Sequence, residues 1–190
     1  MKEEKTIKKN VKKLTRSEKI LMNKIRIREA GESGRKDFSR DYPNGTIFFF
    51  YKEKDKILAF GGLEPIKLNY LAKNYDILGI CNIFSVEKGK GYGTILIAEI
   101  IKYLKKTGKT GLGFCGEKTA KFYEKAGLKS KKGFSLRLEM ENPKTKERIP
   151  DPDGGCPGIY IEGKDKLISK MSKGKAIATY WLPRLKEPHF

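Results

Sequence analysis

The apolar residues in the middle of the chain repeat at helical spacing. Ile97, Ile100, Ile101 and Leu104 stand at positions i, i+3, i+4 and i+7, and Gly108 follows them. Residues at this spacing share one face of a helix, and glycine often ends a helix because it adopts left-handed backbone angles. The pattern predicts an amphipathic helix that packs on a sheet and stops at Gly108.

Stretches rich in β-branched, apolar and aromatic residues predict strands along most of the remaining chain. The predicted strands are residues 46–52 and 57–63, which form a hairpin, and then 76–84, 111–115, 134–140, 159–161, 167–168 and 176–182. Residues 118–125 predict a second helix, closed by Gly127 and with Phe122 in the core. Residues 142–158 contain four prolines and three glycines, which predicts a long loop over the substrate cleft.

The N-terminal segment is predicted to be helical. Thr15 and Glu18 have the spacing of a capping box, so a helix should begin there and end at Gly31. Its predicted apolar face consists of Ile20, Leu21 and Ile25. The helical spacing extends back to Ile7, Val11 and Leu14, so residues 5–30 are interpreted as one broken helix or two.

The segment from Ile83 to Thr94 joins a strand, three alternating glycines and the start of a helix. Glycines let the backbone approach an anion closely, while the helix start adds unpaired amides and the positive end of its dipole. This combination predicts a phosphate site made by the backbone. Its spacing matches neither the dinucleotide pattern G-x-G-x-x-G nor the triphosphate pattern G-x-x-x-x-G-K-[ST].

Two sequence blocks together resemble the GNAT N-acetyltransferase superfamily. The glycine loop is similar to the acetyl-coenzyme A loop V-x-P-x-x-[RQ]-G-x-G-x-[GA], with Ile83, Ser85 and Lys88 in the Val, Pro and Arg/Gln places. Residues 120–128 resemble the second signature, N-x-x-A-x-x-[LF]-Y-x-K-x-G-[FL], with Glu117 in place of Asn. The blocks stand in the usual order with a predicted strand between them.

The resemblance implies an α/β domain with a mixed, mostly antiparallel central sheet flanked by helices. We expect an amphipathic helical segment over residues 1–31, an acetyl-coenzyme A-binding core over 41–140, and a loop-rich extension of the same domain over 141–190. The implied activity is direct transfer of an acetyl group from acetyl-coenzyme A to a primary amine, without a metal. The acceptor is left open: a small molecule, a protein or an aminoacyl-tRNA.

The resemblance also implies where the cosubstrate binds. The backbone of residues 88–94 would hold the pyrophosphate, while Ile83 and Phe84 would pair with the pantetheine arm, with Ile83 as the expected donor to the thioester oxygen. The expected cofactor-binding residues are Ile83, Phe84, Ser85, Lys88, Gly89, Lys90, Gly91, Tyr92, Gly93 and Thr94.

The catalytic groups are predicted less directly. Tyr123 occupies the place from which a tyrosine protonates the leaving thiolate in many relatives, and the alternative is a ring that only packs on the sheet. The nearest candidates for the general base are Glu64, predicted to end a hairpin strand, and Asp76, predicted to open the next one. Asp151 and Asp153 in the predicted loop are further candidates.

The chain is strongly basic, with a formal net charge of +19. A lysine-rich, solvated surface is one interpretation, and a polyanionic partner such as nucleic acid is the other. The second leaves an alternative function, a basic nucleic-acid- or ribosome-associated binding module that retains the fold. The contacts expected for such a partner are Lys8, Lys9, Lys12 and Lys13.

Composition gives two further expectations. The N-terminus is charged and no apolar run is long enough to span a bilayer, so we expect a cytoplasmic protein without a membrane partner. The three cysteines, Cys81, Cys115 and Cys156, are odd in number and widely spaced. We therefore expect reduced core residues and neither a disulfide framework nor a zinc site.

Overall fold

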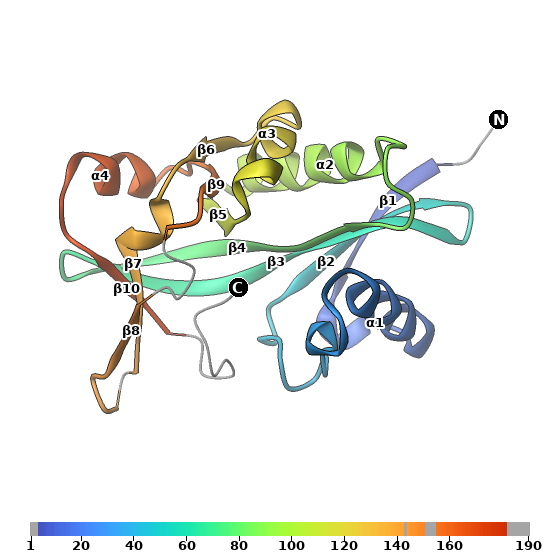
Figure 1. Cartoon of the computed structure of the whole chain (residues 1–190), viewed down its shortest axis with the longest axis horizontal. Coiled ribbons are helices and arrows are strands. Elements are labelled where there is room, and N and C mark those ends of the chain that lie inside the picture. Colours follow the sequence, from blue (N-terminus) through green and yellow to red (C-terminus); the bar gives the residue numbers. More distant parts are fainter. Residues whose placement is uncertain (1–3, 143, 151–154, 182–190) are drawn as a thin grey trace.

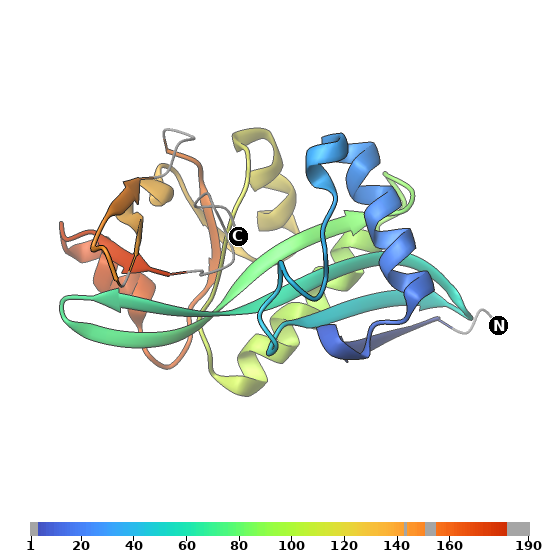
Figure 2. The ribbon, with the colours of Figure 1, turned by 90° about the horizontal axis from the view of Figure 1, so that it is seen from below.

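The computed structural model describes residues 4–142, 144–150 and 155–181. They form a curled, mainly antiparallel sheet with helices on both faces (Figures 1 and 2), which confirms the expected fold class. The strands are β1 (Glu4–Asn10), β2 (Ile47–Glu53), β3 (Lys56–Tyr70), β4 (Lys73–Ser85), β5 (Gly111–Phe114), β6 (Lys129–Lys131), β7 (Leu138–Glu141), β8 (Arg148–Pro150), β9 (Gly158–Ile161) and β10 (Ala178–Tyr180). The helices are α1 (Arg16–Ala30), α2 (Tyr92–Thr107), α3 (Glu117–Lys125) and α4 (Leu167–Lys173), and the 3-10 turns are η1 (Val11–Lys13), η2 (Glu32–Gly34) and η3 (Phe134–Arg137).

The sheet is built around the long hairpin of β3 and β4. The first half of β3 pairs with β2, which pairs with β1, while the second half of β3 pairs with β10 and the sheet continues through β7 to β8. On the other side, β4 pairs in parallel with β5, and β9 and β6 follow. Strands from both ends of the chain therefore extend one sheet.

The helices cover the two faces of the sheet unequally. Figure 1 shows α2, α3 and α4 on one face and α1 on the other. The buried side of α2 carries the apolar residues predicted from the sequence, and the helix ends at Gly108 with a φ of 67°. On the opposite face, Met22 and Ile25 of α1 pack in a cluster with Phe48 and Phe60 of β2 and β3.

The predicted boundaries of α1 are confirmed, but its predicted apolar face is partly wrong. The Glu18 amide donates to Thr15 Oγ1 at 3.2 Å, the Thr15 amide donates to Glu18 Oε2 at 3.0 Å, and the helix ends at Gly31. Ile20 is 59% exposed. The residues of α1 that are buried are Glu18, Met22, Ile25 and Arg26.

The predicted helix before residue 15 is wrong, because residues 4–10 form strand β1. Every residue from Glu4 to Asn10 pairs with β2, for example Ile7 with Phe50. Of the three residues at helical spacing, only Ile7 lies in β1, while Val11 begins the 3-10 turn η1 and Leu14 follows that turn. The unpaired outer edge of β2 decides the outcome by offering backbone partners.

The C-terminal part differs from the sequence prediction in three places. Residues 134–137 form a 3-10 turn, and the strand begins only at Leu138. The predicted loop contains β8, which pairs with β7 and is joined to it by the ion pair of Arg148 Nε with Glu141 Oε2 at 2.9 Å. The predicted strand at residues 167–168 is the start of α4, where Asp165 Oδ1 accepts from the Leu167 amide at 2.9 Å. The predicted strands at 159–161 and within 176–182 are present as β9 and β10.

Other expectations concern disulfides, metal sites and membrane-spanning segments. Cys81 is a buried free thiol, and Cys115 and Cys156 are half-buried free thiols. In the described part of the chain, no three His, Cys, Asp or Glu side chains are grouped so that they could hold a metal ion. None of the described helices is long and apolar enough to cross a membrane.

Candidate active site

Strand β4 leaves its neighbour β5 soon after the two meet. They pair only where Leu78 and Gly79 face Gly111 and Leu112. From Ile80 onward, no strand of the described chain pairs with this outer edge of β4. The separation leaves backbone groups of β4 available at an opening between β4 and α3.

A β-bulge bends β4 beside this opening. Two residues, Asn82 and Ile83, stand opposite the single residue Gly61 of β3, and Asn82 has a left-handed φ of 57°. A β-carbon on Gly61 would lie 2.4 Å from Ile83 Cδ1, so the Ile83 side chain as placed packs directly over this glycine.

A groove of about 640 Å³ begins at the last three residues of β4, Ile83 to Ser85, and reaches the N-terminus of α2. Every residue that the sequence predicts to bind the cofactor lines this groove except Lys90, which is exposed beside it. The strand end, the glycine loop and the helix start, which are consecutive in the chain, thus form one continuous wall, and Glu29, Thr119 and Phe122 from distant segments complete the groove.

The glycine loop presents its backbone to this groove. Gly89 and Gly91 have φ angles of 78° and 76°, in the left-handed region that side chains disfavour. Helix α2 begins at Tyr92, and among the described residues the amides of Tyr92 and Gly93 in its first turn have no backbone acceptor. Unpaired amides at a helix start form a site for an anion such as a pyrophosphate.

Side chains of α1 hold the end of β4 and the loop in place. Lys88 Nζ donates to Glu29 Oε2 at 2.7 Å, and Arg28 donates to the carbonyls of Ser85 and Val86 at 3.2 and 3.0 Å. The hydrogen bond from Lys88 holds the pKa of the Glu29 carboxyl below its usual value. Glu29 and Lys88 both line the groove, so this ion pair lies at its wall.

Phe122 belongs to the groove and not to the core, contrary to the sequence prediction. It is 38% exposed and lines the groove opposite the loop. A β-carbon on Gly93 would lie 3.1 Å from Phe122 Cζ, so the first turn of α2 packs closely against α3.

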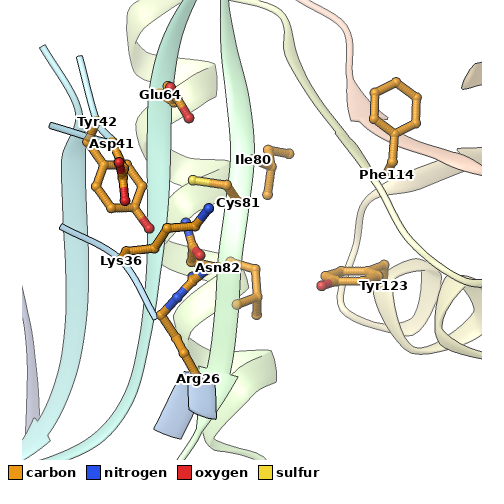
Figure 3. Close-up of a pocket in the computed structure, with 11 residues that line it drawn as sticks. Arg26, Lys36, Asp41, Tyr42, Glu64, Ile80, Cys81, Asn82, Phe114 and Tyr123 are labelled. Carbon is orange, nitrogen blue, oxygen red and sulfur yellow. The ribbon is translucent and has the colours of Figure 1, made fainter. Parts of the chain in front are cut away.

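A second, smaller cavity of about 240 Å³ meets the groove at Ile83, which lines both. Figure 3 shows that its side chains come from β3, β4, β5, α3, α1 and the segment after α1. Glu64 and Tyr123, two of the predicted catalytic residues, both line it. Asp76 is exposed on β4 and is not among its lining residues. Asp151 and Asp153 lie outside the described residues.

Burial changes the acidity of both groups in this cavity. Glu64 is 5% exposed, and loss of solvent raises the pKa of its carboxyl to about 7 against the opposing effect of Lys36. Tyr123 is 9% exposed, and burial raises the pKa of its hydroxyl well above the usual value. Near neutral pH, Glu64 can therefore exchange a proton, while Tyr123 keeps its own.

Comparison with known proteins identifies the family. A model of the Acetyltransferase (GNAT) family matches residues 16–128, more than half of the 190-residue chain. The chain belongs to the GNAT acetyltransferase family. A comparison with curated proteins gives no match.

Solved structures agree with this assignment at the level of the fold. Escherichia coli YhbS, a GNAT family N-acetyltransferase in complex with CoA, aligns with a TM-score of 0.57 and 11% identity over 92% of this chain and 89% of its own. Escherichia coli ElaA aligns with a TM-score of 0.56 and 11% identity over 84% of this chain and 99% of its own. An acyl-CoA N-acyltransferase from Pseudomonas aeruginosa aligns with a TM-score of 0.54 and 12% identity over 82% of this chain and 98% of its own.

Sequence reasoning missed the polar residues that the N-terminal segment adds to this GNAT chain. Arg26, Lys36, Asp41 and Tyr42 all line the smaller cavity but belong to neither sequence block. One signal was present: Arg26 stands one turn after Met22 and next to Ile25, both apolar, and is therefore a cation on the buried side of α1. Lys36, Asp41 and Tyr42 show no comparable pattern.

We expect Gly91→Val to abolish acetyl-coenzyme A binding while the protein remains folded. A β-branched residue at a φ of 76° costs about 1–2 kcal/mol and would turn the loop amides away from the groove. Calorimetric titration of acetyl-coenzyme A measures the loss. Gly133→Val is the matched control, because it places similar strain at a φ of 61° outside the groove. Unchanged affinity in folded Gly91→Val would remove the loop from the site.

Glu64→Gln should stabilise the protein above pH 7. The folded pKa of about 7 exceeds the unfolded value of 4.5, so stability falls as pH rises through this window. The full penalty at higher pH is on the order of 3 kcal/mol, and glutamine does not incur it. Thermal melts at pH 8 and pH 4.5 compare the proteins. The melting temperature of the variant should exceed that of the wild type only at pH 8. An equal difference at both pH values would contradict the assigned burial penalty.

Proposed function

We propose that the protein transfers an acetyl group from acetyl-coenzyme A to a primary amine by direct attack. The observation that carries this proposal is the meeting of two cavities at Ile83. One has the unpaired amides and open strand edge suited to the cosubstrate, and the other holds a buried acid. An amine bound in the smaller cavity would face the thioester across Ile83.

The backbone of β4 supplies the groups that would hold the thioester. The Val86 amide donates to the Leu58 carbonyl of β3 at 2.9 Å. Because amide directions alternate along a strand, the Ser85 amide points away from β3 and toward the groove. Ile83 lines the same groove at the bulge, where the ladder with β3 is interrupted. This supports Ile83 as the donor to the thioester oxygen, where one such hydrogen bond contributes on the order of 3 kcal/mol to catalysis. Acetyl-coenzyme A supplies the activated acetyl group.

Glu64 and Tyr123 divide the proton transfers between them. The Glu64 carboxylate takes one proton from the ammonium form of the acceptor, which frees the nitrogen lone pair to form the new C–N bond. As the C–S bond breaks, Tyr123 donates its proton to the departing sulfur. The proton that the acylated nitrogen then loses restores Tyr123 through solvent, so the step releases one proton overall through Glu64.

The structure offers less support for the nucleic-acid alternative. Lys8 and Lys9 lie on strand β1 and Lys12 and Lys13 in η1, so the four do not share a helix. Lys9 Nζ forms an ion pair with Glu18 at 2.8 Å, and Lys8 Nζ lies 5.1 Å from the centre of the Tyr103 ring. These two ammonium groups already make contacts within the fold.

Coenzyme A release from acetyl-coenzyme A on addition of amines tests the proposal, with Glu64→Gln as the diagnostic variant. We expect kcat/KM to rise with pH through about 7 in the wild type, because the carboxylate is the active form, and to fall roughly 100-fold in the variant. Asp76→Asn, which removes an exposed carboxylate, is the control. No release with any amine, despite tight acetyl-coenzyme A binding, would overturn the function.

Tyr123→Phe should lower kcat without weakening acetyl-coenzyme A binding, since it removes one hydroxyl and keeps the ring. General acid catalysis is worth roughly 100-fold to 10,000-fold. Tyr75→Phe, at a similarly buried position far along β4, is the control for loss of a buried phenol. Single-turnover kinetics isolates the chemical step. A loss of less than about threefold in the single-turnover rate would show that Tyr123 only packs on the sheet.

A further inference from the structure

Arg26 places a buried cation in the smaller cavity. Its side chain is 8% exposed, and its Nε donates to the Gly34 carbonyl at 2.6 Å. Its Nη1 is also buried, and the described residues offer it no hydrogen-bond partner. A buried guanidinium nitrogen without a partner is costly, so this atom points to a ligand that completes its hydrogen bonds.

Lys36 adds a second cation to the same cavity. The Asn23 side chain fixes its backbone: Asn23 Nδ2 donates to the Lys36 carbonyl at 2.9 Å, and the Lys36 amide donates to Asn23 Oδ1 at 3.0 Å. Among the described residues, the Lys36 ammonium has neither a hydrogen bond nor an ion pair within 4 Å. Figure 3 shows the side chains of Arg26 and Lys36 reaching toward Asn82 and Cys81.

The two carboxylates of the cavity do not neutralise these cations. Asp41 is already engaged, because its Oδ1 accepts from Arg40 Nε at 2.9 Å and its Oδ2 accepts from the Asp37 amide at 2.8 Å. Glu64 is largely desolvated, and burial raises its pKa to about 7, so it is only partly charged at neutral pH. The cavity therefore carries a net positive charge on its α1 side and an acid on its β3 side.

We propose that the acceptor is a small amine that also carries an anionic group, a carboxylate or a phosphate, bound by Arg26 and Lys36. This inference rests on the proposed function and adds the class of its substrate. The anion would complete the hydrogen bonds of Arg26 Nη1, whose planar fork suits both oxyanions. The amine of the same molecule would then lie toward Glu64.

The size and charge of the cavity limit the acceptor further. A volume of about 240 Å³ is below the usual range of drug-sized ligand sites, roughly 300–1,000 Å³, so the bound part is small. Polyamines and lysine-rich peptides would bring further positive charge against Arg26 and Lys36. We therefore expect such amines to be poor acceptors.

Paired acceptors that differ only in the anionic group test the inference. Glycine and β-alanine are compared with their amides, and phosphoethanolamine with ethanolamine, by coenzyme A release. We expect the anionic member of at least one pair to have a kcat/KM about 10-fold to 100-fold higher, the range for hydrogen bonds to charged groups. The two sets separate a carboxylate site from a phosphate site. Equal or better turnover of the neutral amines would overturn the inference and leave the acetyltransferase proposal standing.

Charge-removing variants locate the effect. Arg26→Gln and Lys36→Gln should each reduce the preference for the anionic member at least severalfold, mainly through KM. Lys24→Gln, which removes an exposed charge from the same helix, should preserve it. Lys36→Gln also covers the case in which the buried Arg26 variant fails to fold. An anion preference that both folded variants retain would overturn the assignment to these residues.

A binding measurement keeps the inference testable if none of these amines is acetylated. Inorganic phosphate and acetate are added to protein saturated with coenzyme A, so that the glycine loop is already filled. We expect one of them to raise the melting temperature of the wild type and of Lys24→Gln by more than that of Lys36→Gln. Equal shifts in all three proteins would reject the anion site, independently of whether the acetyltransferase proposal survives.

Discussion

The short pairing between β4 and β5 is the constraint on which the site depends. A strand that loses its neighbour leaves amides and carbonyls unpaired, and these must find other partners. In this chain the separation begins after Gly79, the bulge follows at Asn82 and Ile83, and the glycine loop and α2 come next. One local departure thus creates both a backbone surface for a ligand and the space to reach it.

Helix α1 connects the two cavities, although it lies across the sheet from α2 and α3. At its C-terminal end, Arg28 and Glu29 hold the end of β4 and Lys88 of the loop. One turn earlier, Arg26 and Asn23 hold the segment that carries Lys36. A shift of α1 would therefore disturb the groove at the glycine loop and the smaller cavity together.

The buried charged groups of the smaller cavity lower the stability of the folded protein. Glu64 is almost fully buried without a direct ion-pair partner among the described residues, and Arg26 has one nitrogen unsatisfied. Burying such groups lowers stability unless they gain partners. The apolar clusters on both faces of the sheet stabilise the fold and offset this cost. A ligand that satisfied these groups would recover part of it.

The sequence by itself determined the local parts of this protein. The capping box of α1, the helix after the glycine loop and the loop itself depend on residues a few positions apart, whose backbone preferences act locally. Two signature blocks were also enough to predict the family and fold.

Only the tertiary structure decided features that join distant segments. Residues 4–10 became a strand because β2 offered an open edge. Residues 167–168 became the start of a helix beside Asp165, whose Oδ1 accepts from the distant Thr110 hydroxyl at 2.7 Å as well as from the Leu167 amide. Burial distinguishes the two candidate bases, because Glu64 is buried and Asp76 is exposed. The residue pattern of either strand does not predict this difference in burial. The positive side of the smaller cavity needed α1 folded against β4, because no spacing along the chain relates Arg26 and Lys36 to Glu64.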